Sequence, residues 1–205
     1  MYNSDEKAIL FIIKAFKEKK DKYSSINKAT LSLLVGLSIR KISDDPNIIT
    51  ASYLHNIINY SSYGYEEIES NFNSNVANIV RDISEDWSLT KWLERKKEYL
   101  NRIKDITNKD YLNIIIAEKT QELLSYHDAY NKKKDKLWKD IGSSKTEITW
   151  FYHSILSICE EKDVSKILLH RYKQEIIHFF GDRLWKKELE NIGNLLFLVL
   201  AFLYL

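Results

Sequence analysis

Structure-breaking residues and cysteines are scarce in this sequence. Its 205 residues include one proline, five glycines and one cysteine. Because proline and glycine are the strongest interruptions of regular structure, their scarcity favours long helices joined by short connections. The single cysteine, Cys159, cannot form a disulfide within the chain, so we expect a reducing, cytoplasmic location. Its apolar surroundings, "SILSICEE", predict a buried structural thiol rather than a nucleophile.

An excess of charge of one sign is also lacking. The chain has 31 lysines and arginines against 29 acidic residues, a formal net charge of +2 with neutral histidines. A dedicated nucleic-acid binder usually carries a strongly basic face, so we assign no nucleic-acid partner. The balance still allows a local basic patch around an anionic small molecule.

Several catalytic motifs are missing. The five histidines do not form the HExxH spacing of a zinc site, and one cysteine excludes cysteine pairs. We find no glycine-rich phosphate loop and no GxSxG nucleophile motif. The first residues lack a basic region before their apolar stretch, which argues against a secretory signal. Any chemistry must therefore come from residues that the fold brings together.

The one long apolar run lies at residues 194–205, "NLLFLVLAFLYL". A helix needs about 20 apolar residues to span a bilayer, so this run is too short to cross one. It predicts a buried final helix or a homodimer contact. A membrane-surface anchor and a truncated longer protein are the less favoured alternatives.

What the sequence has in abundance is apolar residues at helical spacing. Apolar side chains recur three and four residues apart, and no alternating strand pattern competes with them. Asp45 and Pro46 predict an N-cap and a first-turn proline for one of these helices. The segments expected to be helical are 7–16, 26–39, 46 to about 60, 64–72, 73–86, 88–105, 109–130, 145–161 and 170–200. The sequence thus predicts an all-α protein.

Two of these helices carry a polar residue inside an apolar stripe. His55 is central in "ASYLHNIINY", and Glu118 follows three isoleucines and an alanine in "NIIIAEKTQELL". Taken singly, His55 is best interpreted as a core histidine and Glu118 as the partner of a neighbouring lysine such as Lys119. Taken together they also fit a shared site, because imidazole and carboxylate suit Mn, Fe or Zn ions.

The order of segments resembles a known family. The sequence reads "ASYLHNIINY", "YEEIESNFNSNVANIVRDISED", "ERKKEYL", "IIIAEKTQELL" and "DKLWKDIGSSKTEITWFYHSILSICEE". This order is similar to that of the metal-dependent HD phosphohydrolases, in particular the hydrolase domain of the RelA/SpoT (p)ppGpp enzymes and their small stand-alone relatives. The resemblance covers roughly residues 8–162. It implies an HD-domain-like helical bundle over residues 1–162 and a C-terminal helical extension, ending in an apolar helix, over residues 163–205.

The resemblance also implies a metal site and a catalytic pair. In the family a first histidine, a His-Asp pair and a distant aspartate hold the ion, which is Mn2+ or another divalent cation. The corresponding positions here are Asn27, His55, Asn56 and Glu118. The family's catalytic Glu-Asp pair falls on Asn59 and Tyr60, which cannot act as general bases at neutral pH. One family ligand is therefore kept and one is replaced by a longer carboxylate.

Substrate contacts follow from the same alignment. The family's asparagine after the distant aspartate corresponds to Glu122, and Arg81 and Arg95 are the candidate partners of substrate phosphates. The five tryptophans are expected in the core and at helix seams rather than as base-stacking platforms.

Three functions remain open at this stage. The first is a catalytically impaired HD-type domain that binds a nucleotide or a protein partner. The second is an active metal-dependent (p)ppGpp or nucleotide pyrophosphohydrolase with an unusual metal shell. The third is a structural helical module that forms homodimers.

Overall fold

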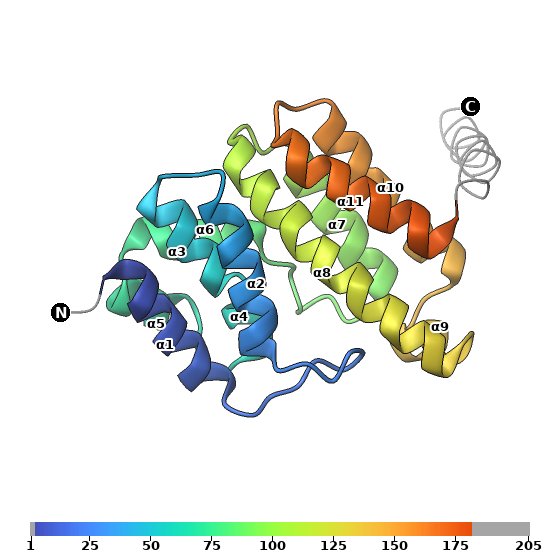
Figure 1. Ribbon diagram of the computed structural model, residues 1–205, viewed down its shortest axis with the longest axis horizontal. Coiled ribbons are helices and arrows are strands. Elements are labelled where there is room, and N and C mark those ends of the chain that lie inside the picture. The colour runs from blue at the N-terminus through green and yellow to red at the C-terminus, as the bar shows by residue number, and fades with distance from the viewer. Residues whose placement is uncertain (1–2, 182–205) are drawn as a thin grey trace.

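The computed structural model describes residues 3–181, and these form eleven α-helices with no strand (Figure 1). The helices are α1 (Ser4–Phe16), α2 (Lys28–Arg40), α3 (Pro46–Leu54), α4 (Ile57–Tyr60), α5 (Tyr65–Asn71), α6 (Ser74–Ile83), α7 (Trp92–Lys104), α8 (Lys109–Lys133), α9 (Lys136–Ile141), α10 (Lys145–Glu160) and α11 (Lys166–Phe180). The predicted all-α class is confirmed. Within this part of the chain, no helix is long and apolar enough to cross a membrane.

The long helix α8 runs through the middle of the molecule. It packs against α2 and α6 on one side and against α11 on the other (Figure 1). The three isoleucines 114–116 are fully buried because both sides of α8 are covered. The molecule can be divided into one half formed by α1–α6 and another formed by α7–α11. The helix α8 belongs to the second half and also contacts the first, so it can supply side chains to a site between them.

The helix expected from residue 46 to about 60 is interrupted. Asp45 caps its start through hydrogen bonds from the backbone N–H groups of residues 47 and 48, and Pro46 fills the first position, as predicted. The helix α3 ends at Leu54, and α4 begins only at Ile57. The intervening pair His55–Asn56 forms a turn. The apolar pattern continues across this break, so hydrophobic spacing alone could not reveal it.

A close approach of α2 and α3 fixes the position of that turn. A Cβ atom at Gly36 would overlap the ring of Tyr53, which is fully buried against α2. Only glycine leaves room for the ring here. The end of α3, and with it His55, is thereby held against α2.

The described part of the predicted C-terminal extension packs into the same core. Its helix α11 lies on α8 and α10 and buries Leu168, Tyr172, Ile176 and Phe180. The helix ends at Phe180, and Gly181 follows with φ of +86°, so the single helix expected over residues 170–200 is wrong at this point. Residues 194–205 and Trp185 lie outside the described residues, and the proposed division at residue 162 stays a prediction.

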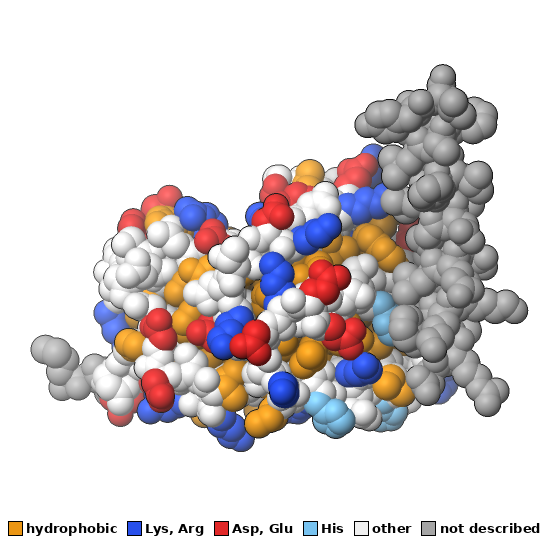
Figure 2. Space-filling model, turned by 90° about the horizontal axis from the view of Figure 1, so that it is seen from above, with side chains coloured by type: hydrophobic (Ala, Val, Ile, Leu, Met, Phe, Trp, Pro, Cys, Tyr) orange, Lys and Arg blue, Asp and Glu red, His pale blue; other side chains and the backbone are white. Residues whose placement is uncertain are grey.

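The face seen in Figure 2 carries acidic and basic side chains side by side. No large area of one sign is visible on it. The even charge of the sequence is thus distributed evenly over this face.

Candidate functional site

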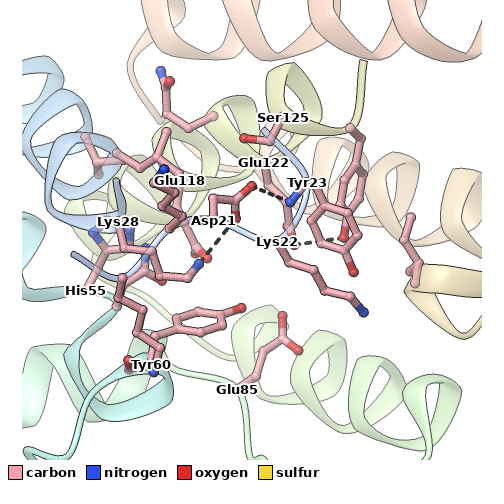
Figure 3. A pocket seen from close by; sticks show the side chains of 18 of the residues that line it. Asp21, Lys22, Tyr23, Lys28, His55, Tyr60, Glu85, Glu118, Glu122 and Ser125 are labelled. Carbon is pink, nitrogen blue, oxygen red and sulfur yellow. Dashed lines mark hydrogen bonds and ion pairs between the residues drawn. The ribbon is translucent and has the colours of Figure 1, made fainter. Parts of the chain in front are cut away.

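A cavity of about 410 Å3 lies between the two halves of the molecule (Figure 3). Its walls come from the loop before α2, the start of α2, the turn between α3 and α4, the loop after α6, and helices α7 and α8. The volume falls within the range of roughly 300–1,000 Å3 that is usual for small-molecule sites. This is the place where the polar residues singled out in the sequence can meet.

The structure brings six of the nine predicted site residues to this cavity. The six that line it are His55, Asn56, Tyr60, Arg95, Glu118 and Glu122. The other three, Asn27, Asn59 and Arg81, are not among the lining residues. Arg81 is exposed on α6, where it pairs with Asp82 and lies over the ring of Tyr65. Its predicted role in binding substrate phosphates has no support from this position.

His55 is held as a neutral imidazole. Its side chain is buried, and Nδ1 lies 2.8 Å from the carbonyl oxygen of Ser52. Because a carbonyl only accepts, Nδ1 donates this hydrogen bond and Nε2 keeps its lone pair. The pKa of His55 is lowered to about 4, mainly by burial; the hydrogen bond to the Ser52 carbonyl opposes this fall, and the positive charges of Lys119 and Lys28 add to it.

Asn27 caps α2 instead of entering the cavity. Its Oδ1 accepts a hydrogen bond from the N–H of Ala29 at 2.8 Å, and its Nδ2 donates to the carbonyl of Lys17. The next residue, Lys28, is the one whose side chain lines the cavity, on the same side as His55 (Figure 3). Of these two neighbouring residues, Lys28 and not Asn27 has a side chain that lines the cavity, and the assignment of Asn27 as the position of the lost histidine stays a prediction.

Lys28 is a buried cation with two partners. Its ammonium nitrogen lies 3.3 Å from Oδ2 of Asp21 and 3.8 Å above the ring centre of Tyr60. Both side chains of the ion pair are about nine-tenths buried. The ring of Tyr60 supplies a cation–π contact in place of a second carboxylate.

A second charge cluster is centred on Glu85, in the loop after α6. Its carboxylate receives Lys96 at 2.5 Å, Lys119 at 3.2 Å and Nε of Arg95 at 3.2 Å. Burial by itself raises the pKa of Glu85, but the charges of Lys96 and Lys119 outweigh it and hold this pKa well below its usual range. Glu85 is therefore ionised and fully engaged by cations.

Lys119 joins this cluster to the predicted site carboxylates. Its ammonium nitrogen is also 3.1 Å from Oε1 of Glu118 and 3.2 Å from Oε2 of Glu122, the latter an ion pair without hydrogen-bond geometry. The interpretation of Glu118 as the partner of Lys119 is confirmed. Burial keeps the pKa of Glu118 above its usual value despite the attraction of Lys119, with the charges of Glu122 and Glu85 adding to the rise.

The donor set does not fit a resident divalent metal ion. Among residues 3–181, no group of three or more His, Cys, Asp or Glu side chains is arranged to hold one. His55 offers one nitrogen, while both nearby glutamates already bind Lys119. Lys28 places a further positive charge in the same cavity. Hard divalent ions depend on anionic oxygen ligands, and here those oxygens are neutralised by lysines.

One tryptophan departs from the expected core position. Trp87 is 48% exposed and lines the cavity, with its ring 5.5 Å from that of Tyr60. The guanidinium of Arg95 lies 4.6 Å from the ring centre of Trp87. An exposed ring beside an arginine is a surface on which a flat aromatic ligand group can stack.

Sequence reasoning missed most of the charged residues at this site. Lysines in amphipathic helices usually face solvent, so nothing local indicated that Lys28, Lys96 and Lys119 are buried. Asp21 lies in a connecting segment, and Glu85 falls within the segment 73–86 that was expected to be helical but lies after the end of α6 at Ile83. The available signal was Glu118 beside Lys119 in an otherwise apolar segment.

Two solved structures share this architecture. A metazoan orthologue of SpoT, which hydrolyses ppGpp and plays a role in starvation responses, matches with a TM-score of 0.72 and 16% identity over 88% of this chain and 98% of that one. A Listeria monocytogenes EGD-e protein matches with a TM-score of 0.62 and 19% identity over 74% of this chain and 99% of that one. No family model and no curated protein matches the sequence. The chain thus has the HD-domain-like fold of the RelA/SpoT hydrolases.

Proposed function

We propose that this HD-type domain binds a phosphorylated nucleotide of the (p)ppGpp class in its central cavity and does not hydrolyse it by the metal-dependent route of the family. The observation that carries the proposal is the state of the site carboxylates. Glu118 and Glu122 both bind the buried ammonium of Lys119. Neither is free to act as an anionic metal ligand.

The charge of the cavity supports an anionic ligand. Its walls carry six basic side chains against four carboxylates. The basic residues are Lys19, Lys20, Lys22, Lys28, Arg95 and Lys96, and the acidic ones are Asp21, Glu85, Glu118 and Glu122. Lys19, Lys20 and Lys22 are partly or fully exposed at one side of the cavity, where a phosphate chain can reach them from solvent. A local positive excess of this kind concentrates anions.

The residues at the family's catalytic positions support impaired chemistry. Tyr60 is partly buried, and its removal from water together with the charge of Glu122 raises its pKa well above the usual value. Its hydroxyl stays protonated at neutral pH and cannot take a proton from water. Asn59 has no basic group and does not line the cavity. Asn59 and Tyr60 therefore do not supply the general base that the family pair would supply.

Hydrolysis and binding are tested separately with the purified full chain. We expect ppGpp incubated with the protein and Mn2+ to be recovered intact by ion-exchange chromatography, and calorimetry to show binding with a dissociation constant in the micromolar range. Release of pyrophosphate that is abolished by His55→Ala would establish the alternative function, an active pyrophosphohydrolase with an unusual shell. Absence of binding would refute the proposed nucleotide ligand.

The two remaining expectations depend on residues outside the described part of the chain. The proposed homodimer contact and the membrane-surface contact both rest on the apolar run 194–205. They stay proposals, and sedimentation of the full chain with and without lipid vesicles distinguishes them.

A further inference from the structure

We propose that the ammonium group of Lys28 is the fixed cation of the cavity, that it binds a phosphate group of the ligand directly, and that this binding requires no divalent metal ion. The inference rests on the proposed function and deepens it. It concerns the residue that stands beside His55 where the family would place a metal ligand.

The first argument is the way Lys28 is positioned. Asp21 is fixed by its own loop, because Oδ1 accepts hydrogen bonds from the N–H groups of Tyr23 and Ser24 and from the Ser24 hydroxyl. Its second oxygen, Oδ2, is left to Lys28 at 3.3 Å. The pKa of Asp21 lies below its usual value. Burial raises this pKa, but the hydrogen bond from the Ser24 backbone and the positive charge of Lys28 lower it and outweigh the effect of burial. Asp21 is therefore a fixed anion beside the ammonium group, and a phosphate oxygen would compete with it for Lys28.

The second argument is spare bonding capacity. An ammonium group has three N–H donors. In the described part of the chain, Lys28 Nζ makes one hydrogen bond, to Asp21, and lies over the apolar face of Tyr60. A 3.3 Å contact is long for a charge-assisted hydrogen bond, whose usual length is about 2.7–2.9 Å. A phosphate oxygen can thus bind Lys28 without displacing a short protein contact.

The third argument is electrostatic. Lysine is a common phosphate ligand that acts as a point charge. The cation that a metal-dependent site borrows from solution is here part of the chain. The same positive charge, with that of Lys119, disfavours a divalent ion next to His55. The positive charge of Lys28 would then both attract a phosphate group and repel a divalent metal ion.

The test is equilibrium binding of ppGpp and of inorganic pyrophosphate, measured by calorimetry in EDTA and in Mn2+. We expect wild-type dissociation constants to agree within about twofold between the two conditions. Lys28→Met should weaken binding of both probes at least about tenfold. Lys166→Met, which removes an exposed lysine of α11 away from the cavity, should leave binding unchanged.

Asp21 gives the sharper variant. In Asp21→Asn the ammonium loses its competing anion, so we expect binding of both probes to become several-fold tighter. A purely structural ion pair predicts the opposite, because loosening the loop would weaken binding. The double variant Asp21→Asn/Lys28→Met leaves no unpaired charge and should bind as weakly as Lys28→Met, with thermal melting by circular dichroism reporting its fold.

The outcomes separate the two proposals. If the wild-type chain binds neither probe, the proposed function fails. If it binds ppGpp only with Mn2+, or if the folded double variant binds as tightly as wild type, the nucleotide site stands and the role of Lys28 is overturned. Metal-independent binding that is lost with Lys28 supports both.

Discussion

Replacing Lys119 by methionine tests whether the ion cluster holds the two halves of the molecule together. Lys119 is 2% exposed, and its ammonium lies within 3.2 Å of the carboxylates of Glu85, Glu118 and Glu122. Methionine keeps most of the side-chain volume, so packing of α8 should persist. What is lost is one cation that neutralises three carboxylates.

The expected cost follows from burial. Removing one partner of a buried ion pair typically costs about 3–5 kcal/mol, because the remaining charge is left without compensation. For a domain of this size, each kcal/mol lowers the melting temperature by about 2–4 °C. We therefore expect the melting temperature of Lys119→Met to fall by roughly 6–20 °C at pH 8.

The pH dependence provides the decisive sign. In the wild type the pKa of Glu85 is held below its unfolded value, so its contribution to the free energy of unfolding is present above about pH 4.3 and is lost as the pH falls. In the Lys119→Met variant the carboxyl groups of Glu85, Glu118 and Glu122 stay buried but lose this cation, so their pKa values should rise. Groups with raised values favour the folded state at low pH and lose that effect as the pH rises. The gap between the two proteins should shrink from pH 8 to pH 5.

Urea unfolding followed by circular dichroism at pH 8, 7, 6 and 5 measures this gap. The matched control is Lys133→Met, which breaks a solvent-exposed pair with Asp140 and should change the stability much less than Lys119→Met at every pH. Equal stability of Lys119→Met and wild type at pH 8 would refute the reasoning. So would a gap that widens on acidification.

Three further outcomes follow from the same structure. Gly36→Ala should destabilise the fold by roughly 1–3 kcal/mol in urea unfolding, since the added methyl group overlaps the buried ring of Tyr53; an unchanged midpoint would contradict this packing. The imidazole of His55 should titrate with a pKa of about 4 in heteronuclear NMR spectra and stay neutral at pH 7, whereas a midpoint near 6.5 would show that it is hydrated. Asn56→Asp combined with Asn59→Glu should not produce Mn2+-dependent pyrophosphate release from ppGpp, because the lysines of the cavity remain; release in this variant would sink the charge argument.

The fold was predictable because the dominant signal is local. Isoleucines 114–116 and the apolar spacing of the other segments need only helical periodicity to be interpreted, and this periodicity set the class and most helix positions. The break at His55–Asn56 escaped it. There the ring of His55 bonds the Ser52 carbonyl, and no apolar residue changes its spacing to mark the turn.

From the residues alone, the site was predictable where a polar residue interrupts an apolar stripe; the resemblance to the family added Asn56, Tyr60, Arg95 and Glu122. His55 and Glu118 are such residues, and both reach the cavity. Lys28 is not, because its burial comes from Asp21 seven residues earlier and from Tyr60 on a different helix. Partners that meet only in the folded chain leave no periodic trace, so of the basic residues that line the cavity only Arg95 was predicted as a site residue from the sequence, and Lys28 was not.

A cavity can supply positive charge to an anionic ligand in two ways, through a bound metal ion or through its own lysines. A metal-dependent cavity surrounds a borrowed cation with carboxylates, whereas this cavity surrounds its carboxylates with lysines. The two arrangements exclude each other, since each lysine that neutralises a carboxylate removes a metal ligand and also repels the ion. A substitution at one position is therefore not enough to convert this lysine-lined cavity into a metal-binding one. The amide at Asn56, the ammonium of Lys28 and the pairing of Glu118 with Lys119 are all consistent with the proposal that this cavity binds phosphate through its own side chains.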